Sequence, residues 1–176
     1  MLADDVRKVL EALASPYCLI GGHAVAARGY PRFTLDHDFL TADKRVLQRE
    51  TWNALDADVD PRKGEYDDPL AGVVHISGRD GSEVDIVVAK WKWELEVIQR
   101  AEPMELGSMT VPVPRTSDLI LLKLAAGGYL DLADVHVLLG IGDREQLIAG
   151  VNEHIGKLRP DAQAAWTTIT SNATSG

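Results

Sequence analysis

The stretch from residue 17 to residue 40, YCLIGGHAVAARGYPRFTLDHDFL, constrains the fold of this chain more than any other. It begins with four apolar residues that favour a β-strand, and Gly21 and Gly22 follow as a turn. An alanine-rich segment then predicts a short helix, and a second strand carries Asp36 and Asp38. The sequence therefore predicts a strand, turn, helix and strand around which the other elements pack.

Asp36 and Asp38 are expected on one face of the second strand, because alternate side chains share a face, and His37 is expected in the core on the other. Two neighbouring carboxylates repel each other unless a cation lies between them. A divalent ion such as Mg²⁺, shared with substrate phosphates, would remove that repulsion. Gly21 and Gly22 let backbone approach an anion closely, and the helix after them offers unpaired N–H groups. The stretch is therefore a candidate metal and phosphate site.

This order of elements resembles the nucleotidyltransferase core of the DNA polymerase β superfamily. More narrowly, it resembles the abortive-infection toxins of the AbiEii and AbiGii type and their small relatives. In that group a glycine turn holds the nucleotide triphosphate, an Asp-x-Asp pair holds the metal ions, and a third acid on a later strand completes the site. Asp85, in the run EVDIVVAK, matches the third acid. The resemblance covers about residues 15–140.

The second signature of the family is a lysine on a helix followed by further acids. The stretch DLILLKLAAGGYLDLADVHVLL matches it with Lys123, Asp131 and Asp134. The resemblance implies that Lys123 meets the triphosphate as a cation. A helix lysine that reaches solvent along its apolar stem remains an alternative for Lys123. Asp131 has an alternative as well, that of a simple helix N-cap.

The resemblance, together with the local pattern, assigns the site residues by role. The predicted catalytic residues are Asp36, Asp38, Asp85 and Lys123, the predicted metal ligands are Asp36, Asp38 and Asp85, and the predicted nucleotide-binding residues are Gly21, Gly22, Arg28, Arg32 and Asp131. Asp85 completes a second metal site and accepts the proton of the acceptor hydroxyl. Arg28 and Arg32 flank the loop before the second strand and could clamp phosphates bidentately, although solvated arginines are equally consistent with the pattern.

The expected activity is transfer of a nucleoside monophosphate from an NTP to a hydroxyl acceptor, with Mg²⁺ as cofactor. The resemblance implies the toxin of a toxin–antitoxin pair, with tRNA or a protein as acceptor and a cognate antitoxin as partner. Two interpretations stay open beside it. Gly22 stands where many members have Ser, which suggests a catalytically weak binding module within such a complex. The acidic charge instead suits a small-molecule nucleotidyltransferase that acts on an antibiotic or a sugar.

Composition limits the class of protein. The net charge of -9 argues against a general nucleic-acid-binding surface, because such binding depends on Lys and Arg. With 176 residues we expect one domain, with its core at about residues 15–115 and a helical part at about 116–170. No apolar run is long enough for a membrane span and the N-terminus is charged, so a cytoplasmic protein is expected. Cys18 lies in an apolar strand and is expected to be a buried, inert thiol.

The remaining patterns complete an α/β (α+β) fold with a small mixed sheet flanked by helices. Asp80-Gly81 predicts a hairpin between strands 73–76 and 83–88. Asp43 can cap a helix that runs to about residue 55, and the segment after it reads as a loop with one weak strand. A short edge strand at 109–113 has prolines at its end. The predicted helices are 2–14, 23–28, 116–126, 130–139, 143–156 and 160–170, and residues 91–98 are expected to form a short helix or an irregular packing segment.

Overall fold

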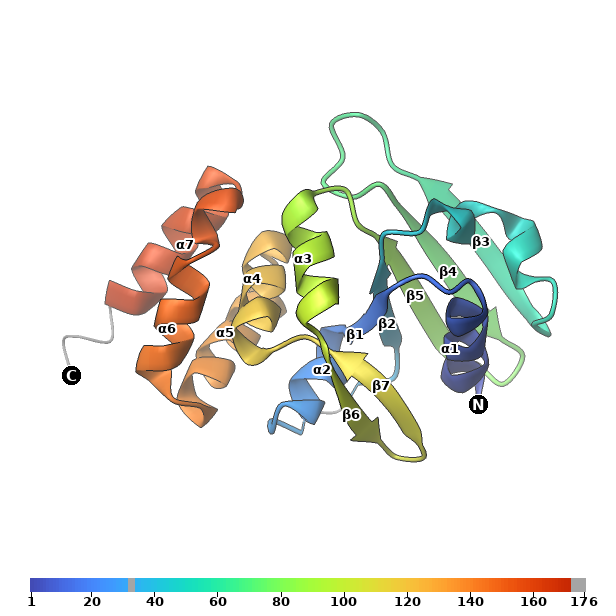
Figure 1. Cartoon of the computed structure of the whole chain (residues 1–176), viewed down its shortest axis with the longest axis horizontal. Coiled ribbons are helices and arrows are strands. Elements are labelled where there is room, and N and C mark those ends of the chain that lie inside the picture. Colours follow the sequence, from blue (N-terminus) through green and yellow to red (C-terminus); the bar gives the residue numbers. More distant parts are fainter. Residues whose placement is uncertain (32–33, 172–176) are drawn as a thin grey trace.

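The computed structural model describes residues 1–31 and 34–171. Within these residues the chain forms a five-stranded mixed sheet, a two-stranded sheet and seven α-helices (Figure 1), which confirms the predicted fold class. The strands of the large sheet are β1 Tyr17–Ile20, β2 His37–Thr41, β3 Ala57–Lys63, β4 Gly72–Gly78 and β5 Glu83–Val88, and those of the small sheet are β6 Glu102–Leu106 and β7 Met109–Val113.

The helices are α1 Leu2–Ala12, α2 Gly21–Ala27, α3 Lys92–Arg100, α4 Thr116–Ala126, α5 Tyr129–Ile141, α6 Arg144–Asn152 and α7 Pro160–Ser171, with short 3-10 helices η1 Lys44–Leu47, η2 Arg49–Trp52 and η3 Ile155–Lys157. Helix α1 lies against the large sheet, and helices α3 to α7 lie beside it, toward the C-terminus (Figure 1). In the described residues, no helix is both long enough and apolar enough to cross a membrane.

The large sheet has the strand order β1-β2-β5-β4-β3. β2 and β5 run parallel at its centre, and every other neighbouring pair is antiparallel. The β4–β5 hairpin predicted from Asp80-Gly81 is present. Gly81 has φ of +80°, a left-handed conformation that glycine adopts without strain, and Asp80 accepts a hydrogen bond from the backbone N–H of Ser82 at 3.0 Å.

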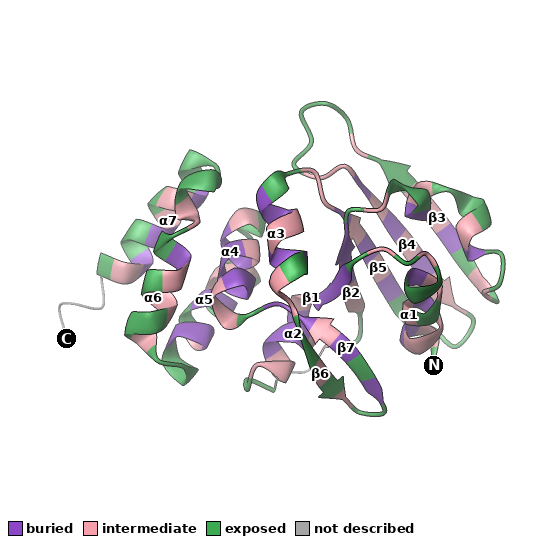
Figure 2. Cartoon of the chain, in the orientation of Figure 1, coloured by how far each residue is buried: buried purple, intermediate pink, exposed green. Residues whose placement is uncertain are grey.

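One face of the large sheet is fully covered. Its side chains alternate with those of the opposite face, as the two-residue period of a strand requires. The buried set on this face is Leu19, Phe39, Val59, Val74, Ile76, Val84 and Ile86. Helix α1 packs here beside β5, because Val6 and Leu10 lie one helical turn apart and share a buried stripe. Figure 2 shows these buried positions as bands along the strands.

The opposite face is covered only in part. Cys18 and Leu40 pack there against Ile98 of α3 and Leu122 of α4. Burial raises the pKa of the Cys18 thiol, so the thiol stays protonated, as expected for an inert buried cysteine. The first residues of β2 and of β5 lie beyond this cluster on the same face. They include Asp38 and Asp85, two of the three predicted metal ligands.

Ion pairs join α3 to the C-terminal helical part. Arg100 of α3 binds the buried Asp118 of α4 through two nitrogens, at 2.7 Å and 3.1 Å. Lys157, after α6, reaches Glu96 of α3 at 2.6 Å. Both contacts place α3 between the sheet and the helices α4 to α7, as Figure 1 shows.

Two local predictions were wrong. The predicted helix from Asp43 to about residue 55 is instead the pair η1 and η2, because Trp52 turns back and donates its indole N–H to the carbonyl of Val46 at 2.8 Å. Asp43 does cap η1, since its side chain accepts from the N–H of Arg45 at 2.9 Å. The strand β6 was not predicted. It pairs with β7 across the two residues Gly107-Ser108, and Gly107 has φ of +60°, so the missed signal was a local glycine turn.

Candidate active site

Gly21 and Gly22, predicted as a turn before the helix, are the first two residues of α2, and Gly21 lies directly against the second acid. Ile20, the last residue of β1, pairs with Asp38 of β2. Gly21 follows with φ of +67°, and a Cβ atom built on it would overlap the Oδ2 atom of Asp38. Any larger residue would displace that carboxylate or bend the turn. The structure therefore brings the predicted phosphate turn and one predicted metal ligand together.

Asp38 and Asp85 are neighbours across the parallel pair at the centre of the sheet. They are register partners in β2 and β5, so their side chains share the partly covered face. Asp36 precedes β2, which begins at His37, and is exposed. Among the described residues no group of three His, Cys, Asp or Glu side chains is arranged to hold a metal ion. The assignment of three acids to one ion therefore stays a prediction, and two of them are adjacent.

His75 is the closest partner of Asp85. Its Nδ1 atom lies 2.5 Å from Oδ1 of Asp85, and its Nε2 atom lies 3.8 Å from Glu83. The hydrogen bond to Asp85 raises the pKa of His75. Both side chains are open to solvent, His75 by 40% and Asp85 by 38%. A ligand can therefore reach this pair.

Sequence reasoning missed the His75–Asp85 pair because it depends on the length of the hairpin loop. The Gly78 N–H donates to the carbonyl oxygen of Ser82 across the turn at 2.8 Å, so three residues separate the paired positions and His75 faces Asp85. A two-residue turn at Asp80-Gly81 would have placed the buried Ile76 opposite Asp85 instead. Gly81 in the left-handed conformation is the signal of the three-residue loop.

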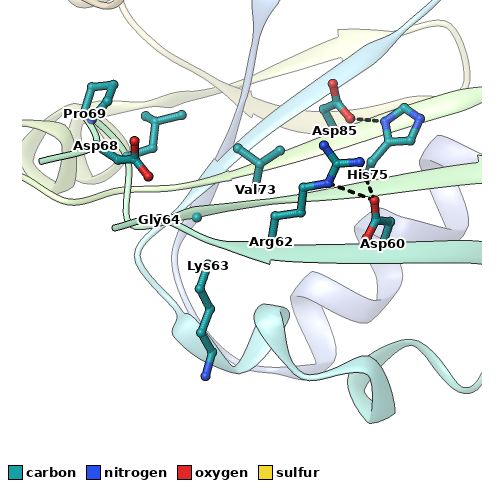
Figure 3. Close-up of a pocket in the computed structure, with 11 residues that line it drawn as sticks. Asp60, Arg62, Lys63, Gly64, Asp68, Pro69, Val73, His75 and Asp85 are labelled. Carbon is teal, nitrogen blue, oxygen red and sulfur yellow. Dashed lines mark hydrogen bonds and ion pairs between the residues drawn. The ribbon is translucent and has the colours of Figure 1, made fainter. Parts of the chain in front are cut away.

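A cavity of about 570 Å³ opens beside Asp85. Its floor is the face of β3, β4 and β5 that also carries His75, and its wall is segment 64–71 (Figure 3). Arg62, Asp60 and Val73 line it together with His75 and Asp85. Cavities of this volume are typical of small-molecule sites in proteins. The predicted third acid thus stands at one end of a space large enough for a substrate.

The predicted lysine signature forms a separate cluster between α4 and α5. Lys123 is buried, and its Nζ atom lies 2.8 Å from Asp131 and 2.8 Å from Asp134. The solvent-reaching alternative for Lys123 is therefore wrong. Asp131 is the third residue of α5 rather than its N-cap, which is Gly128, and its carboxylate accepts from the Gly128 N–H at 3.3 Å. The contact of Lys123 and Asp131 with a triphosphate stays a prediction.

No protein-family model and no curated protein matches the chain. Solved structures with a similar fold do match it. The antibiotic-resistance factor ANT(2'')-Ia aligns over 99% of this chain and 92% of its own, with 14% identity and a TM-score of 0.56. Its complex with adenylyl-2''-tobramycin aligns over 89% and 96%, with 17% identity and a TM-score of 0.58. The chain has a nucleotidyltransferase fold. The lincosamide antibiotic adenylyltransferase LnuA, with lincomycin bound, also shares the fold over 80% and 96%, with 11% identity and a TM-score of 0.53.

Arg28, one of the two arginines predicted to clamp phosphates, binds other groups of the chain in the structure. Arg28 donates to the carbonyl oxygens of Pro114 at 2.7 Å and Val113 at 3.0 Å, and it pairs with Glu102 at 3.2 Å. These contacts attach α2 to the two-stranded sheet. A phosphate contact by Arg28 stays a prediction, and Arg32 lies outside the described residues.

Two histidines support the strand that carries the acids. His37 stacks on His23 of α2 with ring centroids 3.9 Å apart, which places it partly buried behind the turn rather than in the sheet core. Burial and the neighbouring His23 lower the pKa of His37 to about 4, so the ring is neutral near pH 7. A neutral ring beside Asp36 and Asp38 leaves the negative charge of the strand end in place.

The chemistry of the donor set fits a hard divalent cation. Asp38 and Asp85 present carboxylate oxygens on one partly exposed face, and Mg²⁺ binds proteins through one or two carboxylates while it keeps water and substrate oxygens as its other ligands. Asp38 and Asp85 can therefore supply all the carboxylate ligands that such an ion needs from the protein.

Proposed function

We propose that this chain transfers a nucleoside monophosphate from an NTP to a hydroxyl group, in a reaction that depends on Mg²⁺. One observation carries the proposal: the Gly21 turn, Asp38 and Asp85 meet on one face of the sheet. These residues come from three elements that are separate in the sequence, α2, β2 and β5. The nucleotidyltransferase fold supports the same conclusion.

In the proposed reaction the acceptor oxygen attacks the α-phosphorus of the NTP. The bond from that phosphorus to the oxygen bridging the β-phosphate breaks, and pyrophosphate leaves with the bonding electrons. Asp85 accepts the hydroxyl proton, and Asp38 and Asp36 join it in holding the metal. When bound, Mg²⁺ supplies positive charge that stabilises the transferring and leaving phosphates. The Gly21–Gly22 backbone lets the triphosphate approach the strand ends closely.

The acceptor that we favour is a small molecule. ANT(2'')-Ia is an antibiotic-resistance factor and LnuA is an antibiotic adenylyltransferase, and this chain shares their fold over most of their length. The cavity of about 570 Å³ beside Asp85 has room for such an acceptor. The net charge of -9 also suits a small acceptor better than tRNA.

A second candidate is the toxin of a toxin–antitoxin pair, with tRNA or a protein as acceptor and an antitoxin as partner. The observation that favours it is the cluster of Lys123 with Asp131 and Asp134, since these residues match the second signature of the AbiEii and AbiGii type. In this candidate the cluster orients the helical part against the nucleotide.

The test is a transfer assay with Mg²⁺ and each labelled NTP. Antibiotics and sugars, tRNA and cell protein are offered separately to the wild type, to Asp38→Asn and to Asp58→Asn, an exposed acid of β3 that serves as the matched control. We expect label on a small molecule, a loss of about 10³-fold in Asp38→Asn and no change in Asp58→Asn. Label only on tRNA or protein supports the toxin. No label on any acceptor overturns the transfer activity and leaves a binding module.

A further inference from the structure

The wall of the cavity beside Asp85 is fixed in place by Lys90, at the junction of β5 and α3. Its ammonium group donates to three backbone carbonyls of segment 64–71, those of Glu65 at 3.3 Å, Tyr66 at 2.6 Å and Asp68 at 2.5 Å. Trp91 adds an indole hydrogen bond to the carbonyl of Pro69 at 3.1 Å. These hydrogen bonds hold segment 64–71, which contains no helix or strand, in a defined conformation.

The two ends of this wall are also closed tightly. Gly64 donates to the carbonyl of Ala71 at 3.0 Å, and Ala71 donates to that of Val88 at 3.0 Å. A Cβ atom on Gly72 would come within 2.7 Å of the carbonyl oxygen of Arg62, so no larger residue fits without movement. Preorganisation of this kind lowers the conformational cost of binding a ligand.

Each carboxylate that lines the cavity already has a partner in the chain. Asp68 accepts a hydrogen bond from the backbone N–H of Glu65 at 2.6 Å, and Asp85 lies 2.5 Å from Nδ1 of His75. Arg62 pairs with Asp60 at 2.7 Å. Figure 3 shows this pair and the His75–Asp85 pair on the same side of the sheet, and it shows Lys63 directed away from both. A charged ligand would therefore have to displace one of these partners to pair with a side chain of the cavity.

The same side chains are well suited to hydroxyl groups. A guanidinium group offers several N–H donors in a plane, and carboxylates offer acceptors beside them, so that neighbouring hydroxyls can each donate and accept. Val73 contributes an apolar surface to the floor beside Arg62, its partner across β3 and β4 (Figure 3). An apolar surface next to the polar pairs matches a ring with hydroxyl groups at its edge.

We propose that this cavity is the acceptor subsite and that it takes an uncharged, polyhydroxylated ring compound of the sugar class, with one hydroxyl directed at Asp85. The inference rests on the proposed function, because Asp85 is the group that receives the proton of that hydroxyl. The subsite is formed by β3, β4, β5 and segment 64–71, without residues of α4 to α7.

The experiment measures sugar binding and nucleotide binding separately. The sugar probes are hexoses in three matched forms, the neutral methyl glycoside, the amino sugar and the sugar 6-phosphate, each followed by saturation-transfer NMR without nucleotide. A fluorescent ATP analogue with Mg²⁺ reports the nucleotide site. The variants are Val73→Trp, which fills the cavity, and Ser77→Trp, on the same face of β4 but outside the cavity.

We expect at least one neutral glycoside to bind about 10-fold more tightly than its charged forms, and Val73→Trp to weaken that binding about 10-fold or more. Ser77→Trp should bind like the wild type, and the nucleotide analogue should bind equally to all three proteins. Preference for a charged form, or equal sugar binding by Val73→Trp, overturns the inference. So does the absence of binding by every neutral glycoside.

A second pair of variants keeps the test decisive if Val73→Trp does not fold. Arg62→Ala removes the donor fork of the cavity, and Arg79→Ala removes an arginine that is equally exposed and equally paired, with Asp56 at 2.7 Å, but lies outside it. Only Arg62→Ala should weaken glycoside binding. Nucleotide binding without sugar binding defeats this inference and leaves the proposed function standing, whereas sugar binding without nucleotide binding defeats both the transfer activity and the acceptor role.

Discussion

The molecule contains two clusters of paired acids, and their surroundings differ. At the strand ends Asp38 and Asp85 share an open face, where the Asp85 side chain is 38% exposed. Between α4 and α5, Asp134 is 6% exposed and Lys123 is 8% exposed. The helical cluster therefore contains its own cation inside the fold, whereas the strand cluster faces a space that solvent and ligands can enter.

This difference separates structural acids from candidate functional ones. A buried carboxylate needs a partner in the folded chain, because the cost of removing its charge from water is large. A carboxylate at an open strand end has no such requirement, so it can exchange its partners for a metal ion or a substrate. The following predictions, from the largest effect on stability to the smallest, test whether the two clusters really behave in these two ways.

The largest effect is expected for Lys123→Met. This change leaves the buried Asp134 without its ammonium partner, which should lower the free energy of unfolding by about 3–5 kcal/mol. Urea unfolding followed by tryptophan fluorescence measures it. Lys8→Met is the control, because that lysine is 58% exposed in its pair with Asp4 and its loss should cost far less stability. If both variants lost the same free energy of unfolding, the distinction between the two clusters would be wrong.

The next effect concerns the glycine turn. Gly21→Ala and Gly81→Ala both place a Cβ atom in the left-handed region, at φ of +67° and +80°, which should cost roughly 1–2 kcal/mol each. Only Gly21→Ala also collides with Asp38, since nothing lies within 4 Å of a Cβ on Gly81. We expect roughly 1–3 kcal/mol more destabilisation for Gly21→Ala, with loss of transfer activity in that variant alone. Thermal unfolding and the transfer assay measure these effects.

A smaller effect is expected at Asp43, a structural acid near the surface. Arg45 and Ser15 hold the pKa of Asp43 well below its ordinary value of 3.8. A lowered pKa in the folded state gives stability that is present above the ordinary value and is lost as the pH falls below it. Asp43→Asn should therefore cost about 1 kcal/mol at neutral pH. It should also lose less stability than the wild type between about pH 5 and pH 2. A parallel pH dependence in the two proteins would contradict this assignment.

The smallest effect on stability is expected for Asp85→Asn. Asparagine keeps the shape of the side chain and can still hydrogen-bond to His75, and the position is open to solvent. We expect a change within about 1 kcal/mol in the free energy of unfolding, together with loss of nucleotidyl transfer. A cost as large as that of Lys123→Met would show that Asp85 is a structural acid.

Much of the local structure could be predicted from the sequence, because its signals act over a few residues. The apolar run before Gly21 marked β1, Asp80-Gly81 marked the hairpin, and the residues of α4 were predicted to the end at Ala126. Asp43 was recognised as a cap, but the helix assigned to it was wrong, because the contact of Trp52 with Val46 depends on how the chain turns back.

The sequence by itself determined the elements and the candidate acids, since strand alternation, glycine turns and helix caps are local properties. Only the tertiary structure decided that Asp38 and Asp85 are neighbours, because the register of β2 and β5 follows from burying Phe39 and Ile86 on the opposite face. It also decided that Lys123 is bound between two helices. Contacts between distant segments depend on which faces pack together, and that choice is made by the whole core rather than by any one stretch.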